Sequence, residues 1–226
     1  MAFAGVPKET FAFLRGLAAN NDRAWFQAHR DDYEAYWLEP AMALVEAIGS
    51  RLRRFAPDVV ADPRVNGSIF RINRDIRFSK DKRPYKTHLD LWFPETKTGQ
   101  KWAPGYWFRL TPDAVSLGAG MHGLDAAMLD RFRQAVGDDE RGPALASAVA
   151  KVRKAGYEVW GEHYKRVPRG FEPDHPRADL LRYDSLTAGG DLPAEEARSP
   201  RFPDLVASHY RKLAPIQRWL VDVVNA

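Results

Sequence analysis

The sequence predicts an α+β fold, with an antiparallel sheet of about four strands in the middle of the chain packed by N-terminal and C-terminal helices. Apolar residues recur at helical spacing in the first quarter, the spacing changes to two from Asn66, and helical spacing returns from Leu124. The 226 residues are 45% hydrophobic and 12% aromatic, enough apolar mass to offset the chain entropy of a folded domain. We therefore expect a single domain over residues 1–226.

That domain is expected to have three parts along the chain: a helical layer at 1–57, the sheet at 64–121, and helices with an irregular segment at 122–226. In the first part, Pro7 suits a first helical position. Asp22 can bond the free amides of a second helix that carries Trp25, Phe26, His29 and Tyr33. A third helix is expected to begin near Pro40, where Ala41, Val45, Ile48, Leu52 and Phe55 form an apolar stripe.

Alternation of apolar and polar residues predicts the strands. In the first strand, Phe70, Ile72, Ile76 and Phe78 share one face, and Arg71, Asn73, Asp75 and Arg77 share the other. Arg74 breaks the alternation because it falls on the apolar face. Three more strands are expected at 89–93, 106–110 and 114–120, with short strands at 157–160 and 181–186 as further candidates.

Helical spacing predicts the rest of the chain. We expect helices at 124–136 and 143–155, and a closing helix from Leu205 to Val224 that is kinked at Pro215. The segment 156–201 is rich in Pro, Gly, Arg and Asp and is expected to be irregular. The helices therefore follow the sheet as well as precede it.

Positive charge is concentrated in one segment. Residues 64–86 contain eight basic and two acidic residues, so this segment carries +6 while the whole chain carries +4. A local field of this kind suggests an anion site and not a protein that coats nucleic acid. Guanidinium groups two residues apart on one strand face, about 7 Å at the rise of a strand, can grip neighbouring oxygens of a phosphate or carboxylate.

A small phosphate- or carboxylate-bearing ligand is therefore the first hypothesis for this segment. Arg71 and Arg77 would clamp the anion, Lys82 would add a point charge, and Tyr85 would donate a hydrogen bond or a proton. If the protein is an enzyme, it would stabilise developing negative charge, although the sequence assigns no nucleophile or base. The expected ligand-binding set is Arg71, Arg74, Asp75, Arg77, Asp81, Lys82, Tyr85 and Lys86.

Two alternatives stay open. The motif could be a structural network of ion pairs, in which Arg74 on the apolar face needs an acidic partner, with Asp75 or Asp81 nearest. The same charges could instead bind nucleic acid. The aromatic stacking surfaces would then be Tyr85, Trp92, Trp102, Tyr106 and Trp107.

The same segment resembles the bacterial and fungal family known as domain of unknown function 2461. Its signature has the form R-x-x-R-D-x-R-F-x-x-x-[DN]-K-x-x-Y, matched by Arg71, Arg74, Asp75, Arg77, Phe78, Asp81, Lys82 and Tyr85. The resemblance extends to Asn20-Asn21 with Trp25-Phe26, to Gly118-Ala119-Gly120 and to Arg182-Tyr183. It implies no established activity, substrate or cofactor.

Other motifs are weaker. Gly118 to Gly123 matches G-x-G-x-x-G, but a dinucleotide fold needs a parallel strand after the helix, so a tight strand exit is favoured. His88 could supply a titratable group near the basic segment. The histidines of Glu162-His163 and Asp174-His175, with Asp179 nearby, have no spacing that forces them onto a metal ion, so loop caps are favoured.

Composition narrows the classes of site and partner. The absence of cysteine excludes disulfides, thiolate metal sites and a cysteine nucleophile. No window approaches the roughly 18 apolar residues of a membrane span, so we expect a cytoplasmic protein without a membrane partner. We expect no metal and no cofactor, and the oligomeric state and any enzymatic activity stay open.

Overall fold

The computed structural model describes residues 3–97 and 103–224. Contacts between Cα atoms divide the chain into two compact units. Unit 1 consists of Met1–Phe93, Trp107–Leu117 and Asp191–Ala207, and unit 2 consists of Pro94–Tyr106, Gly118–Gly190 and Ser208–Ala226. Each unit combines segments that are distant in sequence, and the single domain stays a prediction.

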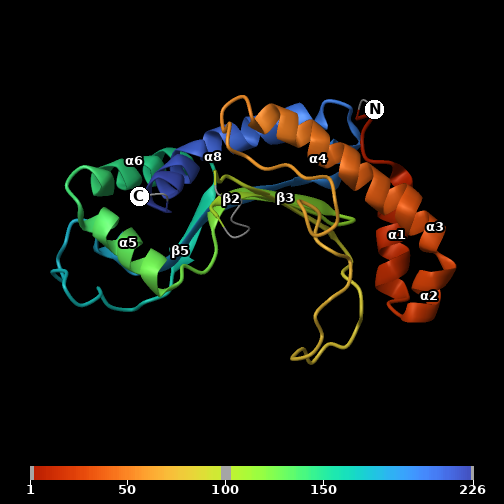
Figure 1. Cartoon of the computed structure of the whole chain (residues 1–226), viewed down its shortest axis with the longest axis horizontal. Helices are drawn as coiled ribbons and strands as arrows, with labels where there is room; N and C mark the ends of the chain where they lie inside the picture. The colour runs from red at the N-terminus through yellow and green to blue at the C-terminus, as the bar shows by residue number, and fades with distance from the viewer. Residues whose placement is uncertain (1–2, 98–102, 225–226) are drawn as a thin grey trace. The chain divides into compact units, whose positions relative to one another are not determined.

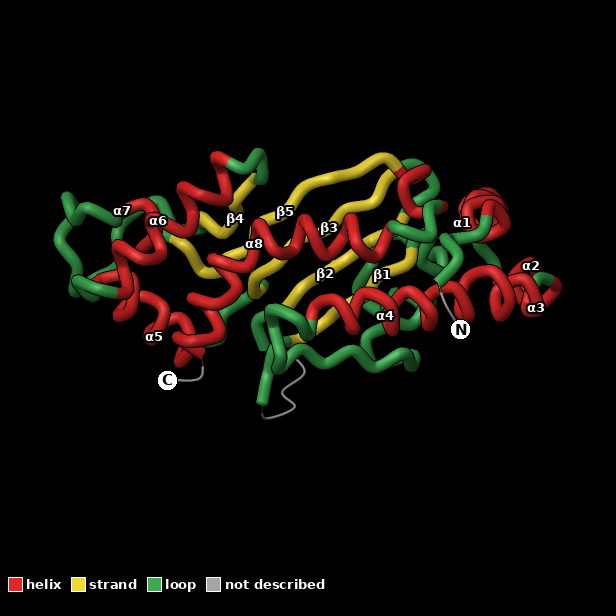
Figure 2. Tube along the Cα trace, turned by 90° about the horizontal axis from the view of Figure 1, so that it is seen from above, coloured by secondary structure: helices red, strands yellow, loops and turns green. Residues whose placement is uncertain are grey.

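One antiparallel sheet of five strands confirms the predicted α+β class (Figure 1). The strands are β1 (Leu89–Pro94), β2 (Gly105–Leu110), β3 (Ala114–Met121), β4 (Glu158–Glu162) and β5 (Tyr183–Pro193), in the order β1-β2-β3-β5-β4. Figure 2 shows the strands lying side by side. Three of the four main predicted strands correspond to β1, β2 and β3, and both short candidates are present as β4 and β5.

The helices of unit 1 confirm the predicted N-terminal layer. They are α1 (Lys8–Ala19), α2 (Arg23–Ala28), α3 (Arg30–Tyr33) and α4 (Glu39–Leu52), with a π-helical turn at Glu34–Leu38 and a 3-10 turn at Ala194–Arg198. Asp22 accepts a hydrogen bond from the backbone amide of Trp25 at 2.9 Å, which is the predicted N-cap.

The core of unit 1 lies between its helices and the sheet. The stripe of α4 is buried from Ala41 to Leu52, and Phe108 of β2 contacts Phe202 of the closing helix α8 (Phe202–Val224) with ring centroids 6.0 Å apart. Trp37 in the π-helical turn is almost fully buried. These apolar contacts hold the N-terminal helices in place, and the loop described in the next subsection is attached to those helices.

In unit 2, helices pack on the strands in the same way. α5 (Ala126–Gly137), α6 (Arg141–Lys154) and the short α7 (Ala178–Leu181) accompany β4 and β5, and Phe132 meets Trp219 of α8 edge to face at 5.5 Å. Pro215 lies inside α8. Gly120 has φ of +135°, and a Cβ there would lie 2.1 Å from the Leu186 carbonyl oxygen, so the glycine permits the close approach of β3 and β5.

The predicted strand over Phe70 to Phe78 is wrong. Residues 70–88, all of which the structure describes, form an irregular loop whose strand-like contact is the isolated bridge between Asn73 and Tyr85. Phe78, expected on the buried face, is 95% exposed, whereas Ile72 is buried. The carboxylates of Asp75 and Asp81 bond to local amides, and such bonds compete with a strand ladder.

No helix within the described residues is both long enough and apolar enough to cross a bilayer.

Candidate functional site: a braced basic arm

Residues 70–88 form a projecting loop that we call the basic arm. It carries seven basic and two acidic residues and is the amber loop that extends from the helices and strands of unit 1 in Figure 1. The Arg74 amide donates to the Pro84 carbonyl at 2.9 Å, and the Lys86 amide donates to the Ile72 carbonyl at 2.8 Å. The two limbs therefore run antiparallel up to Arg74, and residues 75–83 form the tip.

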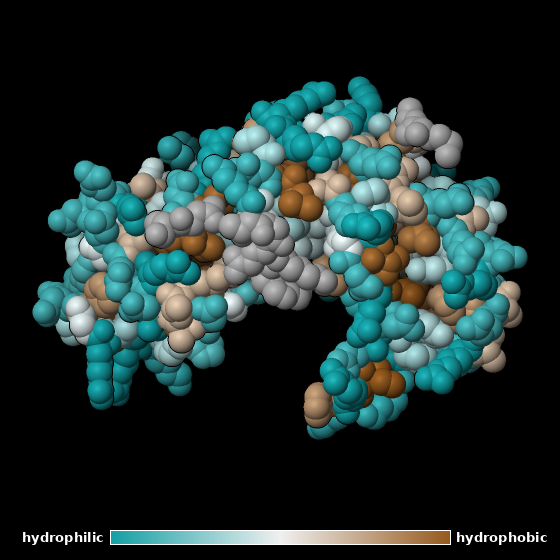
Figure 3. Space-filling view, in the orientation of Figure 1, coloured by the Kyte–Doolittle hydropathy of each residue, from teal (hydrophilic) through white to brown (hydrophobic). Residues whose placement is uncertain are grey.

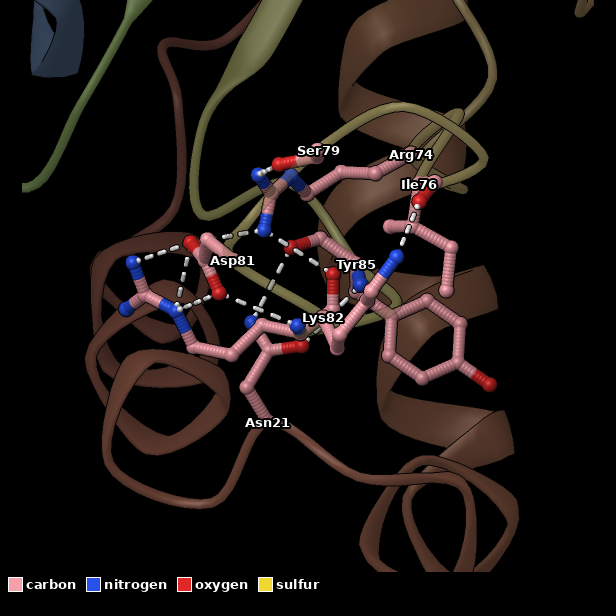
Figure 4. Close-up of polar contacts among 8 residues, drawn as sticks. Asn21, Arg74, Ile76, Ser79, Asp81, Lys82 and Tyr85 are labelled. Atoms are coloured by element: carbon pink, nitrogen blue, oxygen red, sulfur yellow. Dashed lines mark hydrogen bonds and ion pairs between the residues drawn. The ribbon is translucent and has the colours of Figure 1, made fainter.

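Asn21 anchors the arm to the turn between α1 and α2. Its side-chain amide donates to the Tyr85 carbonyl, and its side-chain oxygen accepts from the Tyr85 amide, both at 3.0 Å (Figure 4). The Tyr85 ring is 6% exposed and stacks on Phe26 with centroids 4.2 Å apart. Tyr85 is therefore the packing point of the arm, a role that the sequence did not predict.

The two carboxylates of the arm each hold the arginine two residues further along the chain. Asp75 accepts from the Arg77 backbone amide, Nε and Nη2, and Asp81 accepts from the same three groups of Arg83, at distances from 2.7 to 3.3 Å. These hydrogen bonds hold the pKa of Asp75 at about 2 and that of Asp81 well below its usual range. Both carboxylates are therefore ionised at neutral pH.

Arg74 braces the arm from within, as the ion-pair alternative predicts. Its Nη1 donates to Asp81 at 2.8 Å and to the Arg83 carbonyl at 2.9 Å, and its Nη2 reaches the Ser79 hydroxyl at 3.4 Å (Figure 4). Asp81 thus holds two guanidinium groups. The acidic partner expected for Arg74 is confirmed, and of the two nearest candidates it is Asp81.

A second cluster, of three basic side chains around one carboxylate, lies at the base of the arm. Asp90 of β1 accepts from Lys86 at 3.2 Å, from His88 at 3.1 Å and from Arg109 of β2 at 2.7 Å. Burial alone would raise the pKa of Asp90, but the hydrogen bonds from His88 and Arg109 outweigh it and hold the pKa below its usual range. Sequence reasoning missed Asp90, although its position between Leu89 and Leu91 marked it as an acidic residue on the opposite strand face.

A hollow of about 410 Å³ lies between these two clusters. Five of the predicted site residues line it, together with Arg83, Thr87 and His88, which were not in the expected set. The five are Arg74, Asp75, Asp81, Tyr85 and Lys86. We call this hollow the arm pocket.

The clamp expected from Arg71 and Arg77 is wrong in its geometry. It required one strand face, and the strand does not form; neither arginine lines the arm pocket, and Arg77 is paired with Asp75. Lys82 also lies outside the pocket lining and donates to the Ile76 carbonyl at 3.1 Å (Figure 4). The basic side chains that line the pocket are instead Arg74 of the first limb, Arg83 of the tip, and Lys86 and His88 of the second limb.

The aromatic residues and the histidines that the sequence singled out can also be placed in the structure. Of the expected stacking aromatics, Tyr85 and Tyr106 are buried, Trp92 and Trp107 are partly buried, and Trp102 lies outside the described residues. Tyr85 and Tyr106 are therefore core residues and are not available for stacking on a base. In unit 2, His163 pairs with Asp184 at 3.3 Å, and the His175 ring accepts from the Arg177 amide, a loop cap as expected.

Comparison with known proteins places the chain in a family. The family model described as Conserved hypothetical protein (DUF2461) matches residues 9–219. The chain belongs to this family. No curated protein matches the sequence. The description of DUF2461 states no activity, so membership of the family assigns no function to the arm or its pocket.

Proposed function

We propose that this DUF2461 protein binds a small phosphate- or carboxylate-bearing ligand in the arm pocket. The observation that carries the proposal is that three basic side chains, Arg74, Arg83 and Lys86, line one hollow, each already oriented by a carboxylate. A hollow of about 410 Å³ is within the size range of small-molecule sites.

The cations keep donors for a ligand although each is paired. Arg83 uses Nε and Nη2 for Asp81, and among the described residues no protein acceptor contacts its Nη1. Lys86 gives one contact to Asp90 and has three protons. Thr87 also lines the hollow. An anion can therefore accept hydrogen bonds from several charged donors without breaking the pairs.

Pre-orientation supports binding here. Free lysine and arginine side chains lose rotamer freedom when they grip a ligand, and that loss lowers affinity. In the arm pocket Asp81 and Asp90 have already fixed the basic groups, and their lowered pKa values keep both carboxylates ionised at neutral pH. In this proposal the same residues have two roles: they form the ion-pair network that holds the arm, and they bind the ligand.

Isothermal titration calorimetry with inorganic phosphate, pyrophosphate and citrate tests the proposal. We expect one saturable site for at least one of these anions, weakened about 10- to 100-fold by Arg83→Ala, since a hydrogen bond to a charged group is worth roughly 1.5–3 kcal/mol.

Arg64→Ala is the matched control. Arg64 makes the same two-residue fork with Asp62, outside the arm and away from the pocket lining. The proposal is contradicted if none of the three anions gives a saturable binding heat with the wild-type protein. It is also contradicted if Arg83→Ala and Arg64→Ala weaken anion binding equally.

A further inference from the structure

The tip of the basic arm presents one aromatic ring to solvent. Phe78 is 95% exposed, whereas the other exposed large apolar side chains of the described chain, Met42, Val60, Trp160 and Tyr164, are 38–42% exposed. Figure 3 shows the arm with a mostly hydrophilic surface and a small hydrophobic patch at its end. No other large apolar side chain of the described chain is exposed to this extent, so the whole face of the ring is open to a partner.

The tip holds this ring in a defined loop. The Ser79 amide donates to the Ile76 carbonyl at 3.3 Å, Lys82 donates to the same carbonyl at 3.1 Å, and Arg74 reaches Ser79 from the limb below. The Arg77 guanidinium lies 5.8 Å from the Phe78 ring centroid. A partner therefore meets a ring whose loop is already ordered, which lowers the entropy cost of association.

The uncompensated charge of the arm lies in the same tip loop as this ring, two and four residues after it in the sequence. Asp75 and Asp81 are occupied by Arg77, Arg83 and Arg74, while exposed Lys80 and Lys82 have no acidic partner among the described residues. An exposed aromatic ring in the same loop as lysines that lack an acidic partner suits an unpaired nucleotide, whose base stacks on the ring while its phosphates meet the lysines.

We infer that the arm tip binds single-stranded nucleic acid, with Phe78 stacking on a base and Lys80 and Lys82 contacting phosphates. The three residues lie outside the arm-pocket lining, so the inference does not depend on a small ligand there. A duplex is less suited, because insertion of the ring would require unstacking of base pairs. A membrane is also less suited, because stable peripheral binding needs more buried apolar area than one ring supplies.

Fluorescence anisotropy of the full chain with a labelled oligothymidylate of about 16 nucleotides tests this inference. Phe78→Ala and Phe78→Leu are both expected to weaken binding about tenfold or more, while Phe78→Tyr retains it, because leucine is apolar but cannot stack. Lys80→Ala and Lys82→Ala are each expected to lower the slope of log K against log salt by about 0.7, the value for single strands.

Tyr164→Ala is the control for an exposed aromatic ring elsewhere and should bind the oligonucleotide like wild type. Equal melting temperatures show that each variant is folded. Phosphate binding in the arm pocket should be unchanged by Phe78→Leu, which separates the two sites. Wild-type affinity of Phe78→Leu, equal affinity for a duplex of the same length, or binding only to phosphatidylglycerol vesicles would each overturn the inference.

Discussion

At the base of the arm, three basic side chains, two from the arm itself and one from β2, meet on the carboxylate of Asp90. Lys86, His88 and Arg109 lie 2.7–3.2 Å from its oxygens, and the Asp90 side chain is only 14% exposed. A carboxylate this buried is costly unless it is paired, and here it has several partners. Removal of its charge would leave the basic groups without their acceptor.

Asp90→Asn is therefore expected to lower the free energy of unfolding by about 2–3 kcal/mol, less than for a fully buried pair because Arg109 is partly exposed. Urea unfolding at pH 7 measures the change. Glu34→Gln breaks the exposed pair with Arg30 and should cost about 0.5 kcal/mol or less. If both variants lose the same small amount of unfolding free energy, Asp90 stabilises the fold no more than an exposed ion pair does.

Single residues were predictable where their partners are local. The need of Arg74 for an acidic partner, and the two nearest candidates, were predicted correctly, although the apolar strand face on which that prediction rested does not form. Asp90 was not recognised although Lys86 and His88 are near it in sequence, because no local pattern shows that they and Arg109 of the neighbouring strand all meet on it. Tyr85 was expected to face a ligand, and only the tertiary contact with Asn21 shows it as an anchor.

Among the elements, the basic arm is where period-two alternation was misleading. Backbone contacts with β1 end at Phe70, whose amide donates to the Asp90 carbonyl at 3.1 Å, so the residues after it have no strand to pair with. The forks at Asp75 and Asp81 then fold the chain locally. Arg74, the exception to the alternation, marked the departure from a strand.

Asn21→Ala is expected to loosen the whole arm, because it removes both hydrogen bonds to the Tyr85 backbone. Hydrogen exchange measures this: the protected amides of Arg74 and Lys86 should exchange about 5- to 10-fold faster, for a loss of roughly 1 kcal/mol in local opening.

Asn20→Ala is the neighbouring control, since the Asn20 side chain bonds only within α1, to the Gly16 carbonyl. It should leave the arm amides unchanged. Unaltered exchange in Asn21→Ala would mean that Tyr85 packing on Phe26 holds the arm without the asparagine.

Across the whole molecule, the order of helices and strands was largely predictable, while the pairing of strands was not. The helices have local signals, such as the Asp22 cap and the stripe of α4. The order β1-β2-β3-β5-β4 joins β3 to β5 past three helices and β4, and no local pattern specifies such a long-range partner. Residues 181–186 indicated a short strand, and β5 extends to Pro193.

The carboxylates also predict how the stability of the whole protein depends on pH. Hydrogen bonds to basic side chains or backbone amides lower the pKa of a set of aspartates in the folded state, with Asp75 at about 2 against an ordinary 3.8. The set is Asp62, Asp75, Asp81, Asp90, Asp138 and Asp204.

Because these pKa values are lower in the folded chain, the unfolded chain binds protons first as the pH falls. The stabilisation is complete above the ordinary value of 3.8 and is lost as the pH drops toward 2. Urea midpoints measured between pH 7 and pH 2 should therefore fall steeply below about pH 4. Asp90→Asn should start lower and fall less steeply, since it lacks one of these protonation sites, and an equal slope in both proteins would exclude Asp90 from the linkage.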